Sequence, residues 1–135
     1  MSGENVEVVR RGFELFWAGD FDAWLETIDP DVGWDISRHP LPDVPNHGRG
    51  RDALLRDMLA TYLSGWVDYS AELEELVDAG DRVVLVLHET ARMRDTGVAL
   101  DRTLVHLWTL RDGRHVFLRV FRTKAEALEA AGIDE

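Results

Sequence analysis

Asp35 and His106 are the two side chains whose types and surroundings point to acid–base chemistry. Asp35 stands between Trp34 and Ile36, after a β-rich stretch. A carboxylate among large apolar neighbours is costly unless it is solvated or paired, so its pKa is open to tuning. His106 lies in a second β-rich stretch, and strand alternation puts it on one face with Trp108. A carboxylate that takes a proton and an imidazole that donates one would form an acid–base pair.

Other reactive patterns are weak or missing. The chain has no cysteine, which excludes thiolate chemistry and disulfides. It has no phosphate loop or dinucleotide fingerprint, so we expect no cofactor. His39, Asp43 and His47 lie in a proline-rich loop, where a metal site is conceivable. Their spacing matches neither a helical nor a zinc-finger ligand pattern, so we expect no metal.

Apolar periodicity, glycines and prolines predict the elements that position these residues. An apolar stripe predicts a helix over 4–18, and Gly19 ends it. A short helix follows, and the turn at 29–31 ends it before a strand that opens at Val32. Residues 37–50 form a loop, and Asp52 caps a helix that runs to about Leu63. The remaining predicted elements are strands over 66–77, 82–94, 98–110 and 114–122, and a final helix over 124–131.

Three turn signals separate the last four strands, at 80–81, 95–97 and 112–113. Such signals between β-branched runs predict hairpins, and therefore an antiparallel meander. Because helices come first and strands follow, the predicted class is α+β, with residues 1–135 as one domain.

The order of helix, short helix, turn, strand and acid resembles the SnoaL-like group of the nuclear-transport-factor-2-like superfamily. Further marks are the Gly-Arg-Gly-Arg entry to the third helix, and the segments AGDFDAWLETIDPDVGWD, DAGDRVVLV, HLWTLRDGRHVFLRVF and EALEAAGI. The resemblance implies a cone in which N-terminal helices pack on a strongly curved antiparallel sheet around a cavity. The superfamily includes ketosteroid isomerases, limonene epoxide hydrolases and polyketide cyclases.

The resemblance also bears on chemistry. In the isomerases the acid matching Asp35 is the general base, and the strand face of His106 points to the cavity. The tyrosine that helps to stabilise their enolate is matched by Gly12, and their second donor by His106. The epoxide hydrolases use an Arg-x-Asp pair, which this sequence lacks. We therefore expect Asp35 and His106 to be the catalytic pair if the cavity is catalytic. The alternative is a solvated Asp35 and a satisfied core histidine.

The chain is rich in aromatic residues, which either pack the core or line a pocket for a flat, mostly apolar ligand. The residues expected to bind such a ligand are Phe13, Trp17, Trp34, His39, Met58, Tyr62, Trp108 and Phe117. The leading function is a small-molecule cavity protein that acts as a cofactor-free isomerase or cyclase on a polycyclic or polyketide-like ligand. The alternative is a non-catalytic binding or dimeric assembly domain.

The net charge of the chain limits the classes of partner that it is expected to bind. With 26 acidic and 15 basic side chains the net charge is −11, which disfavours nucleic acid and anionic membranes. No signal peptide or membrane-length apolar run is visible, so we expect a cytoplasmic protein. Apolar residues on both faces of the strand over 82–94 predict a homodimer that pairs through the sheet.

Overall fold

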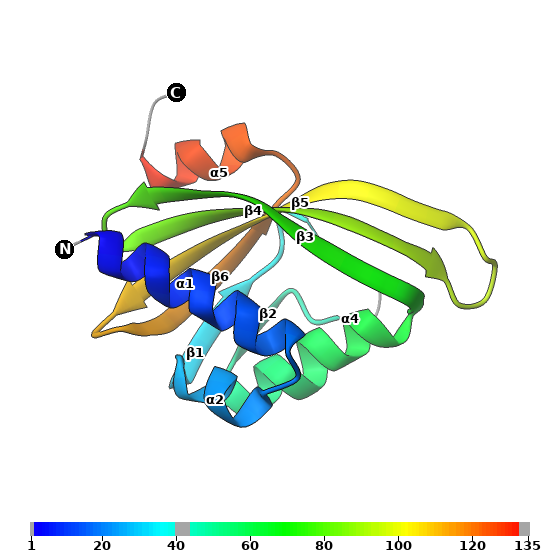
Figure 1. Cartoon of the computed structure of the whole chain (residues 1–135), viewed down its shortest axis with the longest axis horizontal. Helices are drawn as coiled ribbons and strands as arrows, with labels where there is room; N and C mark the ends of the chain where they lie inside the picture. The colour runs from blue at the N-terminus through cyan, green and yellow to red at the C-terminus, as the bar shows by residue number, and fades with distance from the viewer. Residues whose placement is uncertain (1, 40–43, 133–135) are drawn as a thin grey trace.

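In the computed structural model, which describes residues 2–39 and 44–132, the N-terminal helices pack against one face of a curled six-stranded sheet and the C-terminal helix packs against the other (Figure 1). The strand order is β2-β1-β6-β5-β4-β3. The strands are β1 (Ile28–Asp35), β2 (His47–Arg49), β3 (Trp66–Ala79), β4 (Arg82–Met93), β5 (Ala99–Arg111) and β6 (Arg114–Phe121). The helices are α1 (Ser2–Trp17), α2 (Phe21–Glu26), α3 (Arg51–Ala53), the π-helix η1 (Leu54–Ala60), α4 (Thr61–Ser64) and α5 (Lys124–Ala131).

The predicted meander is confirmed. β3–β4, β4–β5 and β5–β6 are antiparallel pairs joined at the three predicted turns. β1 pairs in parallel with β6, and the hairpin signals in the sequence do not predict this pairing. The sheet is therefore mixed, and it delivers the end of β1 beside the end of β6.

The start of β1 corrects the sequence prediction. The strand begins at Ile28 and not at Val32, so Pro30 lies inside the strand. The pairing of β1 with β6 is irregular between Ile28 and Gly33. Proline has no N–H to donate, and such an interrupted stretch of ladder tolerates it. The loop over 37–50 also contains a short strand, β2, which is antiparallel to β1.

The predicted helix over 52–63 forms as the consecutive segments α3, η1 and α4, which we call the third helical segment (51–64). Its N-cap is Gly50, at φ 102°, and not Asp52, which lies in the first turn. Glycine reaches this φ without a steric penalty. Leu54, Met58 and Tyr62 are the buried residues of the segment, and their spacing of four places them on one inward face.

Two apolar clusters lie on opposite faces of the sheet. On the concave face, alternate residues of β4 and β5 pack under the helices; they include Val83, Leu85, Leu87, Leu104 and Trp108. On the outer face, Val84, Val86, Val105, Leu107 and Phe121 pack with Ala127 and Leu128 of α5. Because α5 covers part of the outer face, that face offers a second chain less apolar surface than the sequence suggests.

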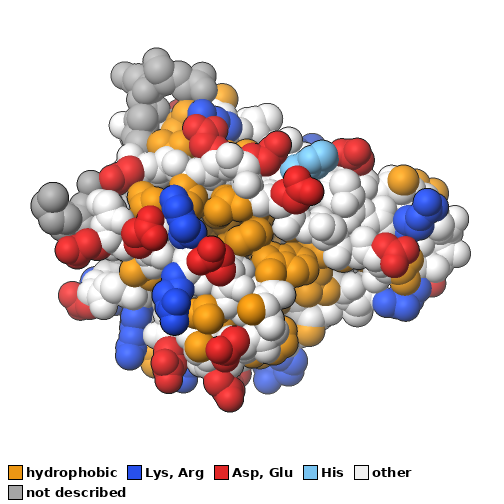
Figure 2. Space-filling model, viewed as in Figure 1, with side chains coloured by type: hydrophobic (Ala, Val, Ile, Leu, Met, Phe, Trp, Pro, Cys, Tyr) orange, Lys and Arg blue, Asp and Glu red, His pale blue; other side chains and the backbone are white. Residues whose placement is uncertain are grey.

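Hydrophobic surface is also visible over α1 and the strands beside it (Figure 2). Trp17, the last residue of α1, is 40% exposed, and its ring stacks on Tyr69 of β3 with 5.6 Å between the ring centroids. This stacked pair joins the end of α1 to the edge strand of the sheet.

Gly48→Ala tests the contact between β2 and the core. A Cβ on Gly48 would lie 2.0 Å from Cζ2 of the buried Trp34 ring, so the ring or the strand must move. We expect a loss of about 1–3 kcal/mol in the free energy of unfolding, measured in urea. Gly65→Ala is the control, because its nearest neighbour would be the Tyr62 carbonyl oxygen at 3.8 Å. Equal stability of the two variants would contradict the packing described.

Candidate ligand-binding cavity

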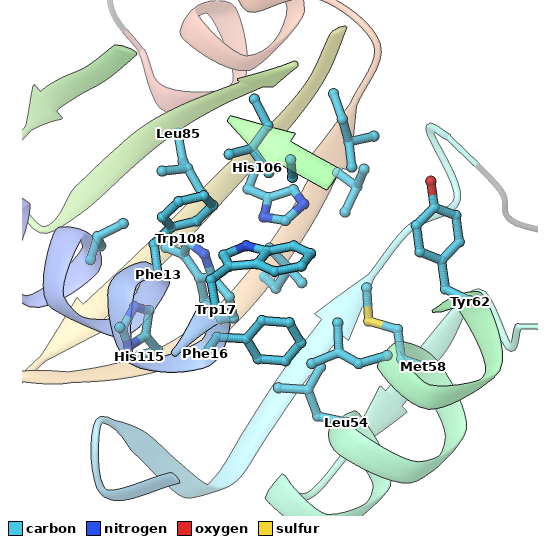
Figure 3. A pocket seen from close by; sticks show the side chains of 18 of the residues that line it. Phe13, Phe16, Trp17, Leu54, Met58, Tyr62, Leu85, His106, Trp108 and His115 are labelled. Carbon is cyan, nitrogen blue, oxygen red and sulfur yellow. The ribbon is translucent and has the colours of Figure 1, made fainter. Parts of the chain in front are cut away.

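A cavity of about 110 Å³ lies between α1, the third helical segment and the concave face of the sheet. Figure 3 shows rings from α1 and β5 and side chains from the third helical segment pointing into it. The walls are mainly apolar, with Phe16, Leu54 and Leu85 among the residues that line them. The polar atoms in such a wall decide which ligand groups are recognised.

Six of the residues that the sequence singles out line this cavity: Phe13, Trp17, Met58, Tyr62, His106 and Trp108. Alternation along β5 explains the last two, because Leu104, His106 and Trp108 share the inward face. Asp35, Trp34, His39 and Phe117 are not part of the lining.

Asp35 does not line the cavity that His106 faces. It is the last residue of β1, where its Oδ1 accepts a hydrogen bond from the Ser37 backbone N–H at 2.9 Å. The same oxygen is 3.7 Å from Nδ1 of His47. Hydrogen bonding from Ser37 holds the pKa of this carboxyl below its usual value, with His47 and Arg119 adding to the effect. Asp35 is thus an ionised group of the partly exposed strand end.

Trp34 and Phe117, which also lie outside the lining, have other neighbours. Trp34 is buried against Gly48, and its indole Nε1 donates to the Pro45 carbonyl at 3.4 Å. Phe117 is 37% exposed. The register of β5 and β6 shifts between Thr109 and Leu110, and this shift places Leu118 and Val120 in the cavity wall instead of Phe117.

His106 is a polar side chain of the cavity wall whose ring nitrogens can hydrogen-bond to a ligand. Its ring meets Trp108 edge-on at 6.5 Å, and no group in the described part of the chain hydrogen-bonds to it. The side chain is half-buried and faces the cavity, and its desolvation there lowers its pKa to about 4. At neutral pH the imidazole is therefore uncharged, with one nitrogen that donates and one that accepts.

A second neutral histidine, His115, was not predicted from the sequence. It lines the cavity, is 2% exposed and lies 4.5 Å from Trp108, ring centroid to ring centroid. Its Nδ1 donates to the Thr27 carbonyl at 2.8 Å, and burial lowers its pKa to about 4. Trp108 therefore contacts two uncharged imidazoles.

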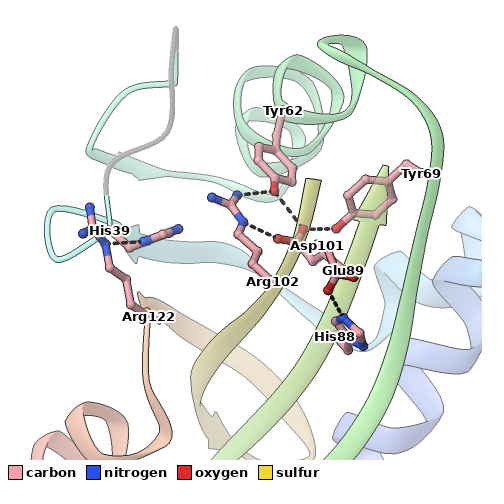
Figure 4. Close-up of polar contacts among 8 residues, drawn as sticks. All are labelled: His39, Tyr62, Tyr69, His88, Glu89, Asp101, Arg102 and Arg122. Atoms are coloured by element: carbon pink, nitrogen blue, oxygen red, sulfur yellow. Dashed lines mark hydrogen bonds and ion pairs between the residues drawn. The ribbon is translucent and has the colours of Figure 1, made fainter. Parts of the chain in front are cut away.

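A buried carboxylate, Glu89, hydrogen-bonds two tyrosines of the cavity lining and was also not predicted from the sequence (Figure 4). It is completely buried; its Oε1 accepts from Arg102 Nε at 2.9 Å, and its Oε2 from the hydroxyl of Tyr62 at 2.8 Å. The hydroxyl of Tyr69 donates to the same Oε2, and Arg102 Nη2 donates to the Tyr62 hydroxyl at 2.6 Å. Burial and the charge of Glu89 raise the pKa of both tyrosines, so both remain protonated donors.

This Glu89 cluster (Glu89, Arg102, Tyr62 and Tyr69) decides what the tyrosines offer to a ligand. Both tyrosines line the cavity, but their hydroxyls are occupied by Glu89. The sequence does contain a signal for the cluster. Glu89 follows Leu85 and Leu87 on the inward face of β4, and it is directly opposite Arg102 on β5. A charged residue at an inward position with an opposite charge across the ladder indicates a buried ion pair.

Among residues 2–39 and 44–132, no group of three or more potential ligands is placed to hold a metal ion. His47 is near Asp35, and His39 accepts a hydrogen bond from Arg122, so the two histidines have different partners. Asp43, the third residue of the conceivable metal site, lies outside the described residues.

The comparisons identify the family. The model of the SnoaL-like domain matches residues 9–117, and the chain therefore belongs to the SnoaL-like domain family. An NTF2-like protein from Burkholderia xenovorans LB400 is 26% identical, with a TM-score of 0.74 over 97% of this chain and 98% of that chain. TerC, co-crystallized with polyporic acid, is 21% identical, with a TM-score of 0.74 over 96% of this chain and 98% of that chain.

A Bacillus subtilis protein that carries only the provisional name of an isomerase is 19% identical, with a TM-score of 0.70 over 99% of this chain and 97% of that chain. No curated protein matches significantly. The predicted resemblance and the cone-shaped α+β fold are thus confirmed.

Glu89→Gln tests the buried cluster. The substitution keeps the shape of the side chain but removes the negative charge to which Arg102 and the hydroxyls of Tyr62 and Tyr69 donate hydrogen bonds. We expect a loss of about 3–5 kcal/mol in the free energy of unfolding, because Arg102 is left without its charged partner. Glu74→Gln, an exposed position of β3, is the matched control and should change stability little. The described role of Glu89 is wrong if the two variants are equally stable.

The neutral histidines predict how stability depends on pH. The pKa of His106 is about 4 in the folded chain, against an ordinary value of 6.5. Between these pH values the unfolded chain binds more protons, so the free energy of unfolding should fall as the pH drops from about 6.5 to about 4. Urea unfolding at several pH values should show a smaller fall for His106→Gln than for the wild type.

His88→Gln is the control for this series, because Asp101 hydrogen-bonds His88 and raises its pKa. The stabilisation from His88 is present at low pH and lost as the pH rises, so its removal should not reduce the acid-side fall. An unchanged slope in His106→Gln would contradict the lowered pKa.

Proposed function

We propose that this SnoaL-like domain binds a small, mostly apolar ligand in its cavity and holds one polar group of that ligand through His106. The observation that carries the proposal is the unpaired, uncharged imidazole of His106 in a wall of apolar side chains. The half-buried ring has an open side at the cavity, where a hydrogen bond to a ligand carbonyl or hydroxyl would contribute about 0.5–1.5 kcal/mol. Ligand pockets typically combine an apolar lining with a few such groups.

The size of the cavity constrains the ligand. At about 110 Å³ it is comparable with an engineered cavity of about 150 Å³ that binds benzene. One ring fits this space, and a larger ligand would extend past Trp17, which lines the cavity and is 40% exposed. The co-crystallization of TerC with polyporic acid supports the view that this fold takes up such ligands.

Binding is the activity that the geometry supports first, and turnover is a separate proposal. A neutral imidazole can polarise a ligand carbonyl by donating a hydrogen bond, which suits a cofactor-free isomerase or cyclase. The provisional isomerase name of one structural relative is consistent with this. Glu89 is fully hydrogen-bonded and Asp35 lies outside the lining, so neither is poised as a base in this arrangement. The alternative remains a non-catalytic binding domain.

Assembly remains a prediction from the sequence. We propose a homodimer through the part of the outer sheet face that α5 leaves uncovered. No helix among the described residues is long and apolar enough to cross a membrane.

Binding of two matched probes tests the proposal. Acetophenone has a carbonyl that His106 can hold, whereas ethylbenzene has a similar shape and no polar atom. Calorimetric titration should show binding of both, and His106→Leu should weaken acetophenone about 5-fold while leaving ethylbenzene unchanged, as expected for one lost hydrogen bond.

Two further variants locate the probes. Ala71→Phe inserts a ring at a residue that lines the cavity and should abolish binding of both probes, whereas Ser70→Phe, at the exposed neighbouring position of β3, should not. Failure of both probes to bind the wild type, or equal binding by Ala71→Phe, would overturn the proposed function.

A further inference from the structure

The orientation of His39 reveals an unused hydrogen-bond donor beside the cavity. His39 is 6% exposed, and its Nδ1 accepts a hydrogen bond from Arg122 Nε at 2.9 Å. Burial, and then the charges of Arg102 and Arg122, lower its pKa, so the ring is neutral and carries its proton on Nε2. This buried Nε2–H has no acceptor among the residues that the structure describes.

Arg102 and Arg122 add further donors at the same place. Figure 4 shows the His39 ring between the Arg122 side chain and the guanidinium of Arg102. Arg102 uses its Nε on Glu89 and its Nη2 on Tyr62, and its Nη1 has no partner within the described ranges. Arg122 is exposed and uses its Nε on His39. The group of His39, Arg102 and Arg122, which we call the donor cluster, therefore has several N–H groups to spare.

The charges near the donor cluster leave a positive surplus. Glu89 and Glu126 are the carboxylates whose charges reach His39. Both oxygens of Glu89 are occupied within its own cluster, and Glu126 pairs with Arg38 at 3.1 Å. Arg102, Arg122 and Arg38 set against Glu89 and Glu126 leave a net charge of +1. This balance suits a monoanion, and the planar fork of arginine matches a carboxylate.

The donor cluster adjoins the cavity. Arg102, Leu104 and His106 occupy alternate positions of β5, which places each about 7 Å from the next along the inward side of the strand. Arg102 also hydrogen-bonds Tyr62, which lines the cavity. A ligand whose ring lies near His106 can therefore reach the donor cluster with a chain of a few atoms.

We propose that His39, Arg102 and Arg122 form a carboxylate-binding subsite, so that the ligand of this protein is a small aryl or alkyl carboxylic acid whose apolar part occupies the cavity. The proposal rests on the proposed function for the apolar part. It adds the charged group of the ligand and the residues that recognise it.

Matched acids and amides test the subsite. The probes are phenylacetate, 3-phenylpropionate and 4-phenylbutyrate, each with its primary amide, titrated by calorimetry at pH 7.5. One of the three chain lengths should let the ring lie in the cavity while the carboxylate reaches the donor cluster. For that length we expect the acid to bind about 10–100-fold more tightly than the amide, as charge-assisted hydrogen bonds imply. His39→Leu and Arg122→Gln should each reduce this ratio towards one while leaving the amide affinity unchanged.

Two controls separate recognition from general electrostatics. Arg119→Gln also removes one positive charge from the end of β6, but Arg119 lies over the Phe121 ring and outside the donor cluster, so the acid preference should persist. His39→Gln restores an N–H donor and should recover part of the preference that His39→Leu loses. Equal affinities of acid and amide, or an equal loss of preference in Arg119→Gln, would overturn the subsite while leaving the proposed function intact.

Acetate distinguishes failure of the subsite from failure of the cavity. Acetate carries the carboxylate without a ring, and it should shift the His39 imidazole NMR signals at millimolar concentration in both the wild type and Ala71→Phe. A shift by acetate with no binding of any phenyl probe would retain the anion site and refute the proposed function. Absence of any acetate shift, with acids and amides bound alike, would refute the subsite alone.

Discussion

The buried carboxylate of Glu89 is the constraint on which the rest of the cavity depends. Burial of an ion without partners costs several kcal/mol, so every segment around it must supply a donor. The third helical segment supplies Tyr62, β3 supplies Tyr69, and β5 supplies Arg102. One charge thereby fixes the mutual positions of the third helical segment, β3 and β5 around β4. Tyr69 in turn stacks on Trp17, so the arrangement extends to the end of α1.

This constraint separates polar from apolar surface within one fold. The tyrosine hydroxyls point to Glu89, which leaves their rings as wall, and the cavity beside them is largely apolar. His106 and His115 are polar groups of that wall, and burial keeps both uncharged. A neutral imidazole can recognise a carbonyl or hydroxyl without introducing a charge into the cavity. The donor cluster lies at the edge of this arrangement, where Arg102 belongs to both regions.

Local patterns in the sequence predict much of this architecture. The three hairpin turns, the α+β class and the inward face of β5 follow from turn residues and strand alternation. The spacing of Met58 and Tyr62 likewise places them on one buried face. These features depend on residues close together in the chain, where backbone geometry dominates.

The parts that escaped prediction depend on long-range pairing. The register shift in β6 exposes Phe117 and turns Leu118 inward, and alternation counted along the strand alone does not contain it. The position of Asp35 depends on its neighbours Ser37 and His47 at the end of β1, which apolar flanking residues do not reveal. The role of Glu89 was not predicted because its partners come from three separate segments. Its inward position alone follows from strand alternation along β4.

The central claim is that a neutral His106 is the polar group with which this cavity holds its ligand. Its most direct test is the nitrogen NMR signals of the His106 ring, followed from pH 7.5 to pH 4 and then at pH 7.5 with acetophenone added. The account predicts an uncharged ring that titrates near pH 4, and nitrogen shifts on ligand addition that show a new hydrogen bond. A ring that titrates near its ordinary value of 6.5, or that is unaffected by a ligand bound in the cavity, would contradict it.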